Sequence, residues 1–328
     1  MRHGGNVWEG GAPEKWLDFS ASLRPEGPPA WVMAALRQAL GDARYYPDRT
    51  MQAARQGLAA YAGVPPESIL PTAGGVAAID LALSLRAGRV LTDGTTFGEY
   101  ADRAAARGRV HVPAEAAVCG PEDTLVICNP NNPTGAALSR ADMLARHRAV
   151  SARGGELIAD EAFIDYCPEN SVRDAARGSL TVVGSLTKIL CVPGARLGYV
   201  CAAPENIARL ERLALPWSLN ALAATVAAAL PEHLAEIRGD AALNADRRAA
   251  FADALKALGV RALPSQANFL LCDFGRDMAE AAARLKARGI LVRTCASFGL
   301  GGQWLRLAVR TEEENDRLIE ELKKCLES

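Results

Sequence analysis

Lys188 follows the run Thr181–Thr187, in which apolar residues give way to small polar ones, and Arg196 lies eight positions further on. The apolar residues predict a buried strand, so the lysine amine is expected at a partly desolvated turn. Desolvation lowers the pKa of a lysine and frees the lone pair that attacks a carbonyl carbon. We therefore interpret Lys188 as an amine that forms a Schiff base.

Two earlier apolar runs also end in polar chemistry. The run Thr124–Cys128 leads directly into Asn129-Pro-Asn131-Asn132-Pro133-Thr134-Gly135, and Glu156-Leu-Ile-Ala-Asp160 ends in a carboxylate. Parallel α/β sheets bind their ligands outside the carboxyl ends of the strands. We therefore expect an amide, an acid, an amine and a guanidinium group to meet at one edge of a sheet.

These groups match the needs of pyridoxal phosphate. Asp160 beside the pyridine nitrogen would keep it protonated, so that the ring accepts electrons from a bond broken at the substrate Cα. Asn132 would donate to the phenolate oxygen, while Ser185 and Arg196 would contact the phosphate. Lys188 would carry the cofactor.

The same motifs resemble those of fold-type I pyridoxal-phosphate enzymes of the aminotransferase superfamily. The resemblance rests on Asn131–Gly135, Asp160–Phe163 and Ser185–Lys188 with Arg196, and it extends from His3-Gly4-Gly5-Asn6 to Trp304–Arg310. Within the superfamily, the chain is most similar to the L-threonine-O-3-phosphate decarboxylase family of cobalamin biosynthesis. The resemblance implies an α/β fold with a large domain, built on a mainly parallel seven-stranded sheet, and a small α/β domain.

The glycine turn Gly74-Gly75-Val76 lies between an expected strand and an expected helix. The N–H groups and dipole of a helix start favour a phosphate there, although a glycine pair also suits an ordinary tight turn. Relatives usually have a polar or hydroxyl residue directly after the first glycine, so here the phosphate grip depends more on backbone amides and side chains elsewhere. The side chains expected to hold the phosphate are Ser185, Thr187 and Arg196.

Two aromatic residues have expected roles that come from the resemblance. Phe97 would stack on the cofactor ring, with core packing as the alternative. Tyr46 corresponds to the tyrosine that relatives extend to the cofactor phosphate of the neighbouring subunit, which implies a homodimer. From its sequence context alone, Tyr46 is a turn residue.

Three basic residues are the expected substrate contacts, together with Asn132. Arg306, in the expected strand Trp304–Arg310, matches the arginine that binds the substrate carboxylate in the superfamily. His3 and Arg293 match positions that help to hold a substrate phosphate in the decarboxylase family. These assignments imply a small phosphorylated amino acid as substrate.

The cofactor permits loss of either a carboxylate or a proton from Cα, and the bond held perpendicular to the ring is the one that breaks. Phe163, where histidinol-phosphate aminotransferases usually have tyrosine, favours the decarboxylase, as do Pro216–Asn220 and the His3 arm. We expect decarboxylation of L-threonine O-3-phosphate to (R)-1-amino-2-propanol O-2-phosphate. The alternatives are O-phospho-L-serine decarboxylation, a histidinol-phosphate-type aminotransferase and a non-catalytic binding module. The intact set of Asn132, Asp160, Lys188 and Arg196 argues against the last.

The order of apolar runs predicts where the domains lie. We expect an N-terminal arm and helix that join the small domain at 1–40, a large cofactor-binding domain at 41–215, and a linker helix with a small domain at 216–328. Strands separated by helices predict a parallel sheet in the large domain. In the small domain, strands are expected at Asn268–Phe274, Ile290–Cys295 and Leu305–Val309.

Composition restricts the class of protein. The 328 residues are 49% hydrophobic with a formal net charge of −1, so we expect no nucleic-acid or membrane-surface partner. The first residues lack the apolar core of a signal peptide, and no transmembrane span is expected, which favours the cytoplasm. The scattered cysteines and histidines predict no metal site. Cys191 is expected to be a buried apolar residue, with an active-site thiol as the alternative.

Overall fold

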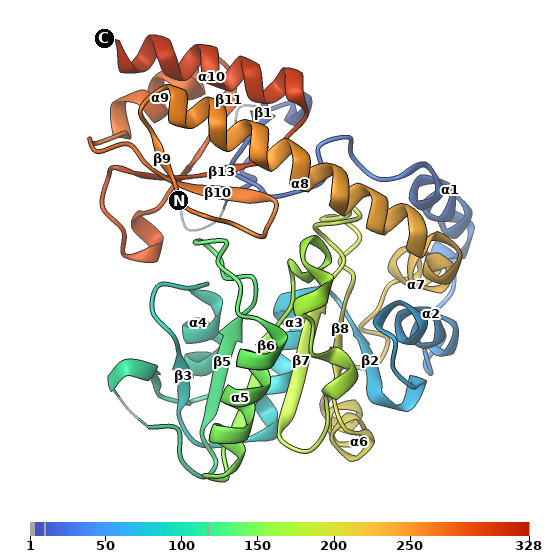
Figure 1. Ribbon diagram of the computed structural model, residues 1–328. Coiled ribbons are helices and arrows are strands. Elements are labelled where there is room, and N and C mark those ends of the chain that lie inside the picture. The colour runs from blue at the N-terminus through green and yellow to red at the C-terminus, as the bar shows by residue number, and fades with distance from the viewer. Residues whose placement is uncertain (1–3, 10, 117, 328) are drawn as a thin grey trace.

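The computed structural model describes residues 4–327 except 10 and 117 (Figure 1). Seven strands form the large sheet in the spatial order β2-β8-β7-β6-β5-β3-β4. Only β8 runs in the direction opposite to the other six strands. The fold class expected from the sequence is confirmed. The strands are β2 (Ile69–Thr72), β3 (Val90–Thr92), β4 (His111–Pro113), β5 (Thr124–Cys128), β6 (Glu156–Asp160), β7 (Leu180–Ser185) and β8 (Gly198–Cys201).

Both faces of this sheet are covered by helices. Successive side chains of a strand point to opposite faces, and both sets belong to buried apolar clusters. In β5, Leu125 and Ile127 belong to one buried apolar cluster, whereas Val126 and Cys128 belong to the other. Six of the seven strands are therefore buried along their whole length rather than at alternate residues. The surrounding helices are α2 (Gln52–Ala62), α3 (Gly75–Ala82), α4 (Glu99–Ala106), α5 (Arg140–Ser151) and α6 (Pro204–Leu213).

A second, smaller sheet has the order β12-β13-β10-β9 and is antiparallel throughout. It packs with α9 (Ala279–Ala287) and α10 (Glu312–Leu326) around a third apolar cluster. The helix α10 begins with a capping box made by Thr311 and Glu314. The strands are β9 (Arg261–Ala262), β10 (Phe269–Asp273), β12 (Arg293–Thr294) and β13 (Trp304–Ala308).

The strand expected over Ile290–Cys295 is two strands, which corrects the sequence prediction. Residues 290–291 form β11 (Ile290–Leu291), which pairs in parallel with β1 (Leu17–Asp18) of the N-terminal arm. Arg293 and Thr294 form β12 and pair with β13. The chain therefore changes partner at Val292, and no glycine, proline or turn residue in the segment 290–295 marks the change.

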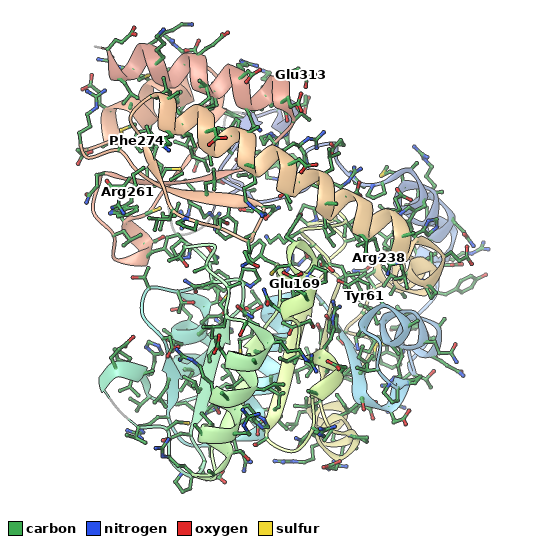
Figure 2. All side chains as sticks on the ribbon, in the orientation of Figure 1. Tyr61, Glu169, Arg238, Arg261, Phe274 and Glu313 are labelled. Atoms are coloured by element: carbon green, nitrogen blue, oxygen red, sulfur yellow. The ribbon has the colours of Figure 1, made fainter. Side chains whose placement is uncertain are left out.

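Two further helices connect the sheets. The long helix α8 (Leu234–Ala257) runs from α7 (Ala221–Ala229) to the C-terminal elements (Figure 1). The N-terminal segment bridges the same two regions, because its β1 pairs beside the small sheet and its α1 (Ala30–Ala39) packs on α7. Figure 2 shows how densely side chains fill the space between these elements. Within the described residues, no helix combines the length and apolarity needed to cross a membrane.

Candidate active site

A cavity of about 200 Å³ lies where the carboxyl ends of β5, β6 and β7 face the small sheet and the N-terminal arm. The large sheet and the first turn of α3 supply one wall, and β12, β13 and the arm supply the other. The residues expected from the sequence that line this cavity are Gly75, Val76, Phe97, Asn132, Asp160, Ser185, Thr187, Lys188, Arg196, Arg293 and Arg306. The structure thus brings together the strand-end polar groups and the two arginines that the sequence predicts as substrate contacts.

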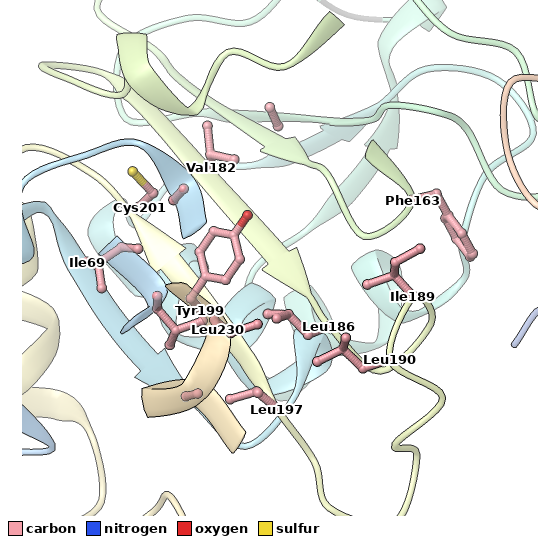
Figure 3. Close-up of a cluster of buried hydrophobic side chains, with 14 of the residues drawn as sticks. Ile69, Phe163, Val182, Leu186, Ile189, Leu190, Leu197, Tyr199, Cys201 and Leu230 are labelled. Atoms are coloured by element: carbon pink, nitrogen blue, oxygen red, sulfur yellow. The ribbon is translucent and has the colours of Figure 1, made fainter. Parts of the chain in front are cut away.

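Lys188 lies in the turn after β7 and is half-buried. Its neighbours Leu186, Ile189 and Leu190 are at most 1% exposed and anchor the turn in the core (Figure 3). Burial, followed by repulsion from Arg306 and Arg196, lowers the pKa of Lys188 to about 8. A substantial fraction of the amine is therefore neutral, and hence nucleophilic, near pH 8.

Asp160 ends β6 and is 4% exposed. Its Oδ1 accepts the backbone N–H of Ala162 at 3.0 Å, and its Oδ2 accepts the hydroxyl of Tyr100 at 2.6 Å. Burial raises the pKa of the carboxyl, while the two hydrogen bonds and Lys188 act in the opposite direction. Because burial opposes ionisation of Asp160, a cation bound beside it in the cavity would stabilise its charged form.

The start of α3 lines one end of the cavity. Gly74 has φ +89°, a backbone conformation that favours glycine, and a Cβ there would lie 2.6 Å from Nη2 of Arg196, so any other residue would also displace the guanidinium group. At Gly75, a Cβ would lie 3.1 Å from Cβ of Ser185. The buried Oγ1 of Thr187 has no hydrogen-bond partner within the described residues. Helix-start N–H groups, hydroxyls and a guanidinium group together suit a phosphate.

Arg293 and Arg306 are direct partners in the register of β12 and β13, so both side chains lie on the same face of the small sheet. Both are buried, at 4% and 6% exposure. The ring of Phe298 lies between them, with its centroid 5.2 Å from Cζ of Arg293 and 6.0 Å from Cζ of Arg306. Two buried cations on one wall favour a ligand with two anionic groups.

Arg306 is fixed by neutral groups. Its Nη1 donates to Oδ1 of Asn132 at 2.6 Å, and its Nη2 donates to the carbonyl of Ser20 at 2.9 Å. The remaining Nε is buried without a partner in the described part of the chain. Burial, with repulsion from Arg293, lowers the pKa of Arg306 to about 10. The charge of Arg306 is thus held in place without a carboxylate from any residue that the structure describes.

The remaining expected residues have different surroundings. Phe97 lines the cavity and meets the ring of Tyr100 edge to face, at a centroid distance of 5.7 Å. Tyr46 lies away from this chain's own cavity, is 81% exposed and packs on Trp217 at 4.9 Å. His3 lies outside the described residues. Cys191 does not line the cavity, and burial raises the pKa of its thiol.

Sequence reasoning did not identify several residues of the site. Ser20 and Ser22 belong to the arm segment, and Ser297 and Phe298 belong to a short 3-10 helix (Ala296–Phe298) after β12. Segments this short carry no periodic signal. Tyr100 was detectable in principle, because it lies three residues after Phe97 and therefore on the same side of a helix start. Within the described residues, no group of His, Cys, Asp or Glu could hold a metal ion.

The chain is similar to known proteins over nearly its whole length. The family model for aminotransferase class I and II matches residues 14–322. Threonine-phosphate decarboxylase of Salmonella typhimurium strain LT2 is 33% identical, covering 99% of this chain and 96% of its own. Histidinol-phosphate aminotransferase of Symbiobacterium thermophilum is 34% identical, covering 94% and 90%. The crystal structure of L-threonine-O-3-phosphate decarboxylase from Porphyromonas gingivalis superimposes with a TM-score of 0.85 at 26% identity, covering 94% of this chain and 99% of that one.

Proposed function

The chain belongs to the aminotransferase class I and II family, and we propose that this pyridoxal-phosphate enzyme decarboxylates L-threonine O-3-phosphate to (R)-1-amino-2-propanol O-2-phosphate. The observation that carries the proposal is the pair of buried arginines, Arg293 and Arg306, on one wall of the cavity. One arginine is enough for an amino-acid carboxylate. The second cation supports a substrate that also carries a phosphate.

The residues of the opposite wall fit the cofactor. Bound there, pyridoxal phosphate supplies a ring that accepts the electrons released at the substrate Cα. Lys188 would carry it, Asp160 would meet its pyridine nitrogen and Phe97 would stack on its ring. Because Oδ1 of Asn132 already accepts from Arg306, the amide nitrogen is the end left to donate to the ring oxygen. The residues that would hold the phosphate are Gly74, Gly75, Val76, Ser185, Thr187 and Arg196.

Arg306, Arg293 and Lys188 would each act on a different group of the substrate. Arg306 would hold the carboxylate, and because Asn132 and Ser20 fix its guanidinium group, the angle of that carboxylate is also fixed. Arg293 would hold the phosphate, whose remote binding energy helps to orient the reacting bond. After carbon dioxide leaves, Nζ of Lys188 would deliver a proton to Cα. A pKa of about 8 allows the amine both to hold and to release that proton near neutral pH.

The wall beside Lys188 supports decarboxylation over transamination. Phe163 is 5% exposed, lies in contact with the cavity and has its ring centroid 6.0 Å from Nζ of Lys188. Histidinol-phosphate aminotransferases usually have a tyrosine at this place, so a hydroxyl is replaced by an apolar edge. O-phospho-L-serine remains a second substrate of the same chemistry, because one methyl group discriminates by only about 1–3 kcal/mol.

The experiment is to incubate the holoenzyme with L-threonine O-3-phosphate, O-phospho-L-serine or histidinol phosphate. We expect carbon dioxide from the first, less from the second, and no conversion of the cofactor to its amine form by the third. Amination of the cofactor by histidinol phosphate, without carbon dioxide from either phospho-amino acid, would replace the decarboxylase with an aminotransferase. The Lys188→Ala variant measures the background.

A homodimer forms part of the proposal. Tyr46 is 81% exposed beside Trp217 and away from its own cavity, which suits a role in the cavity of a second copy. Mixing Tyr46→Phe and Lys188→Ala subunits tests this role. One site of the hybrid dimer would then contain neither defect, so the mixture should recover activity above that of either parent. A monomeric protein in solution would contradict the proposal.

A further inference from the structure

Tyr100 lies in the first turn of α4, behind the cavity wall, and its side chain is 0% exposed. Its hydroxyl donates to Oδ2 of Asp160 at 2.6 Å. We infer that Tyr100 is a positioning residue, which holds the Asp160 carboxylate in its charged form and in the orientation that the cofactor nitrogen requires. The inference rests on the proposed placement of Asp160 beside that nitrogen.

The geometry fixes both oxygens of the carboxylate. Ala162 donates its backbone N–H to Oδ1 at 3.0 Å, while Tyr100 donates to Oδ2 from a different element. Two donors that approach from separate places prevent rotation about the last side-chain bond. Each carboxylate oxygen keeps a further lone pair, and Asp160 itself lines the cavity. The carboxylate is therefore held ready for a cationic ligand.

The charges around Asp160 assign a direction to this hydrogen bond. Burial, and then the neighbouring Asp160, raises the pKa of Tyr100 well above its ordinary value, so the phenol keeps its proton and can only donate it to the carboxylate. The other titratable groups that face Asp160 are Cys128, on β5, and Lys188, after β7. Burial also raises the pKa of the Cys128 thiol, so the thiol stays neutral. Among these groups, Tyr100 is thus the uncharged one that donates a strong hydrogen bond to the Asp160 carboxylate.

The same turn of α4 also supports the ring face of the site. Phe97 lies three residues before Tyr100, lines the cavity and meets the Tyr100 ring at 5.7 Å with an interplanar angle of 88°. This helix start would therefore position two contacts of the cofactor, the stacking ring directly and the acid through Tyr100. Replacing tyrosine by phenylalanine keeps this packing and removes only the hydroxyl.

A second tyrosine–aspartate pair provides a matched control. Tyr61, on α2, is labelled in Figure 2 and donates its hydroxyl to Oδ1 of Asp165. Burial raises the pKa values of both groups, as it does for Tyr100 and Asp160. Neither Tyr61 nor Asp165 lines the cavity. Tyr61→Phe therefore removes the same kind of bond at a place where no cofactor is expected.

The test compares wild-type holoenzyme with Tyr100→Phe, Tyr61→Phe and Asp160→Asn. Two readouts need no substrate: the midpoint pH of the absorbance change of the lysine-bound cofactor, and the rate at which pyridoxal phosphate is released on dilution. We expect Tyr100→Phe to shift the midpoint in the same direction as Asp160→Asn but less, and to release cofactor roughly tenfold faster, as expected for one lost hydrogen bond to a charged group. Tyr61→Phe should match the wild type in both readouts.

Three results would overturn the inference. Equal shifts in Tyr100→Phe and Tyr61→Phe would reveal a general loss of stability, which thermal melting of the cofactor-free variants checks directly. If Asp160→Asn strongly changes the midpoint pH and the release rate but Tyr100→Phe changes neither, the role of Tyr100 is rejected and that of Asp160 stands. A silent Asp160→Asn would reject the placement of Asp160 together with that of Tyr100. None of these readouts depends on which substrate reacts, so a failure of the decarboxylase proposal is seen separately.

Discussion

The two walls of the cavity are built in different ways. The cofactor wall, the side proposed to hold the cofactor, consists of strand ends and a helix start that emerge from the buried core of the large sheet. The substrate wall, the side proposed to hold the substrate, consists of β12, β13, a short 3-10 helix and the N-terminal arm, and it carries a buried pair of positive charges. The first wall suits a ligand that a whole family shares. The second suits recognition that differs between members.

The walls are nevertheless joined by one contact. Arg306 of the substrate wall donates to Oδ1 of Asn132, which extends from β5 on the cofactor wall. Arg306 also contributes to the lowered pKa of Lys188. Changes on the substrate wall should therefore affect the cofactor wall through Arg306, and much less through Arg293.

The largest expected effect comes from Lys188. Lys188→Ala should reduce carbon dioxide release by roughly a thousandfold or more, because it removes both the cofactor attachment and the proton donor. Borohydride reduction and peptide mapping should place the cofactor on Lys188. Lys256→Ala, at the exposed end of α8, serves as control and should behave as wild type. A label on any other lysine would contradict the assignment.

Arg293 should have the next largest effect, confined to the substrate wall. Arg293→Gln should cost about 2–5 kcal/mol in kcat/KM with L-threonine O-3-phosphate, because a buried substrate phosphate would lose its partner charge. The slow reaction of unphosphorylated threonine should change little. Arg261→Gln, on β9 of the same sheet and 63% exposed, is the matched control. Equal losses for both substrates would show that Arg293 supports the fold or the cofactor instead.

The difference between the walls also explains how much the sequence revealed. Asn132, Asp160 and Lys188 each follow a long apolar run, so strand ends and polar residues could be recognised together. The number of strands in the large sheet, by contrast, was expected from the resemblance to the family. A sequence pattern cannot show a change of strand partner, and the break at Val292 was therefore missed.

Contacts between distant segments were equally inaccessible from the sequence. The bond between Arg306 and Asn132 joins residues 174 positions apart, and that between Tyr100 and Asp160 joins residues 60 apart. Phe298 ends a 3-10 helix of three residues, which is too short for any periodicity to mark a site. The roles expected of His3 and Tyr46 come from the resemblance, and they remain predictions.

The electrostatic link between the walls predicts a pH effect. Covalent attachment of pyridoxal phosphate needs the neutral amine of Lys188, so the attachment rate of the cofactor-free protein should rise with pH through about 8 and then level off. Arg306 lowers this pKa by repulsion, so Arg306→Gln should raise it and move the midpoint to higher pH. Arg293→Gln is the control and should leave the midpoint nearly unchanged. A shift of equal size in both variants would contradict a specific link through Arg306.

The smallest expected effect comes from Ser297 on the substrate wall and tests whether its hydroxyl binds the substrate. Oγ of Ser297 accepts from Nη2 of Arg293 at 2.6 Å, so its own hydroxyl proton is left to donate towards a ligand bound by that arginine. Ser297→Ala should therefore weaken the binding of L-threonine O-3-phosphate by about 1 kcal/mol, the usual contribution of one hydrogen bond. Inorganic phosphate, tested as a competitive inhibitor, should also bind more weakly to Ser297→Ala, and by a similar amount. The midpoint pH for cofactor attachment should not move, because no hydrogen bond joins Ser297 to Arg306 or Asn132 in the described part of the chain. A change in that midpoint, or an undiminished affinity for both phosphates, would show that Ser297 does not belong to the substrate wall.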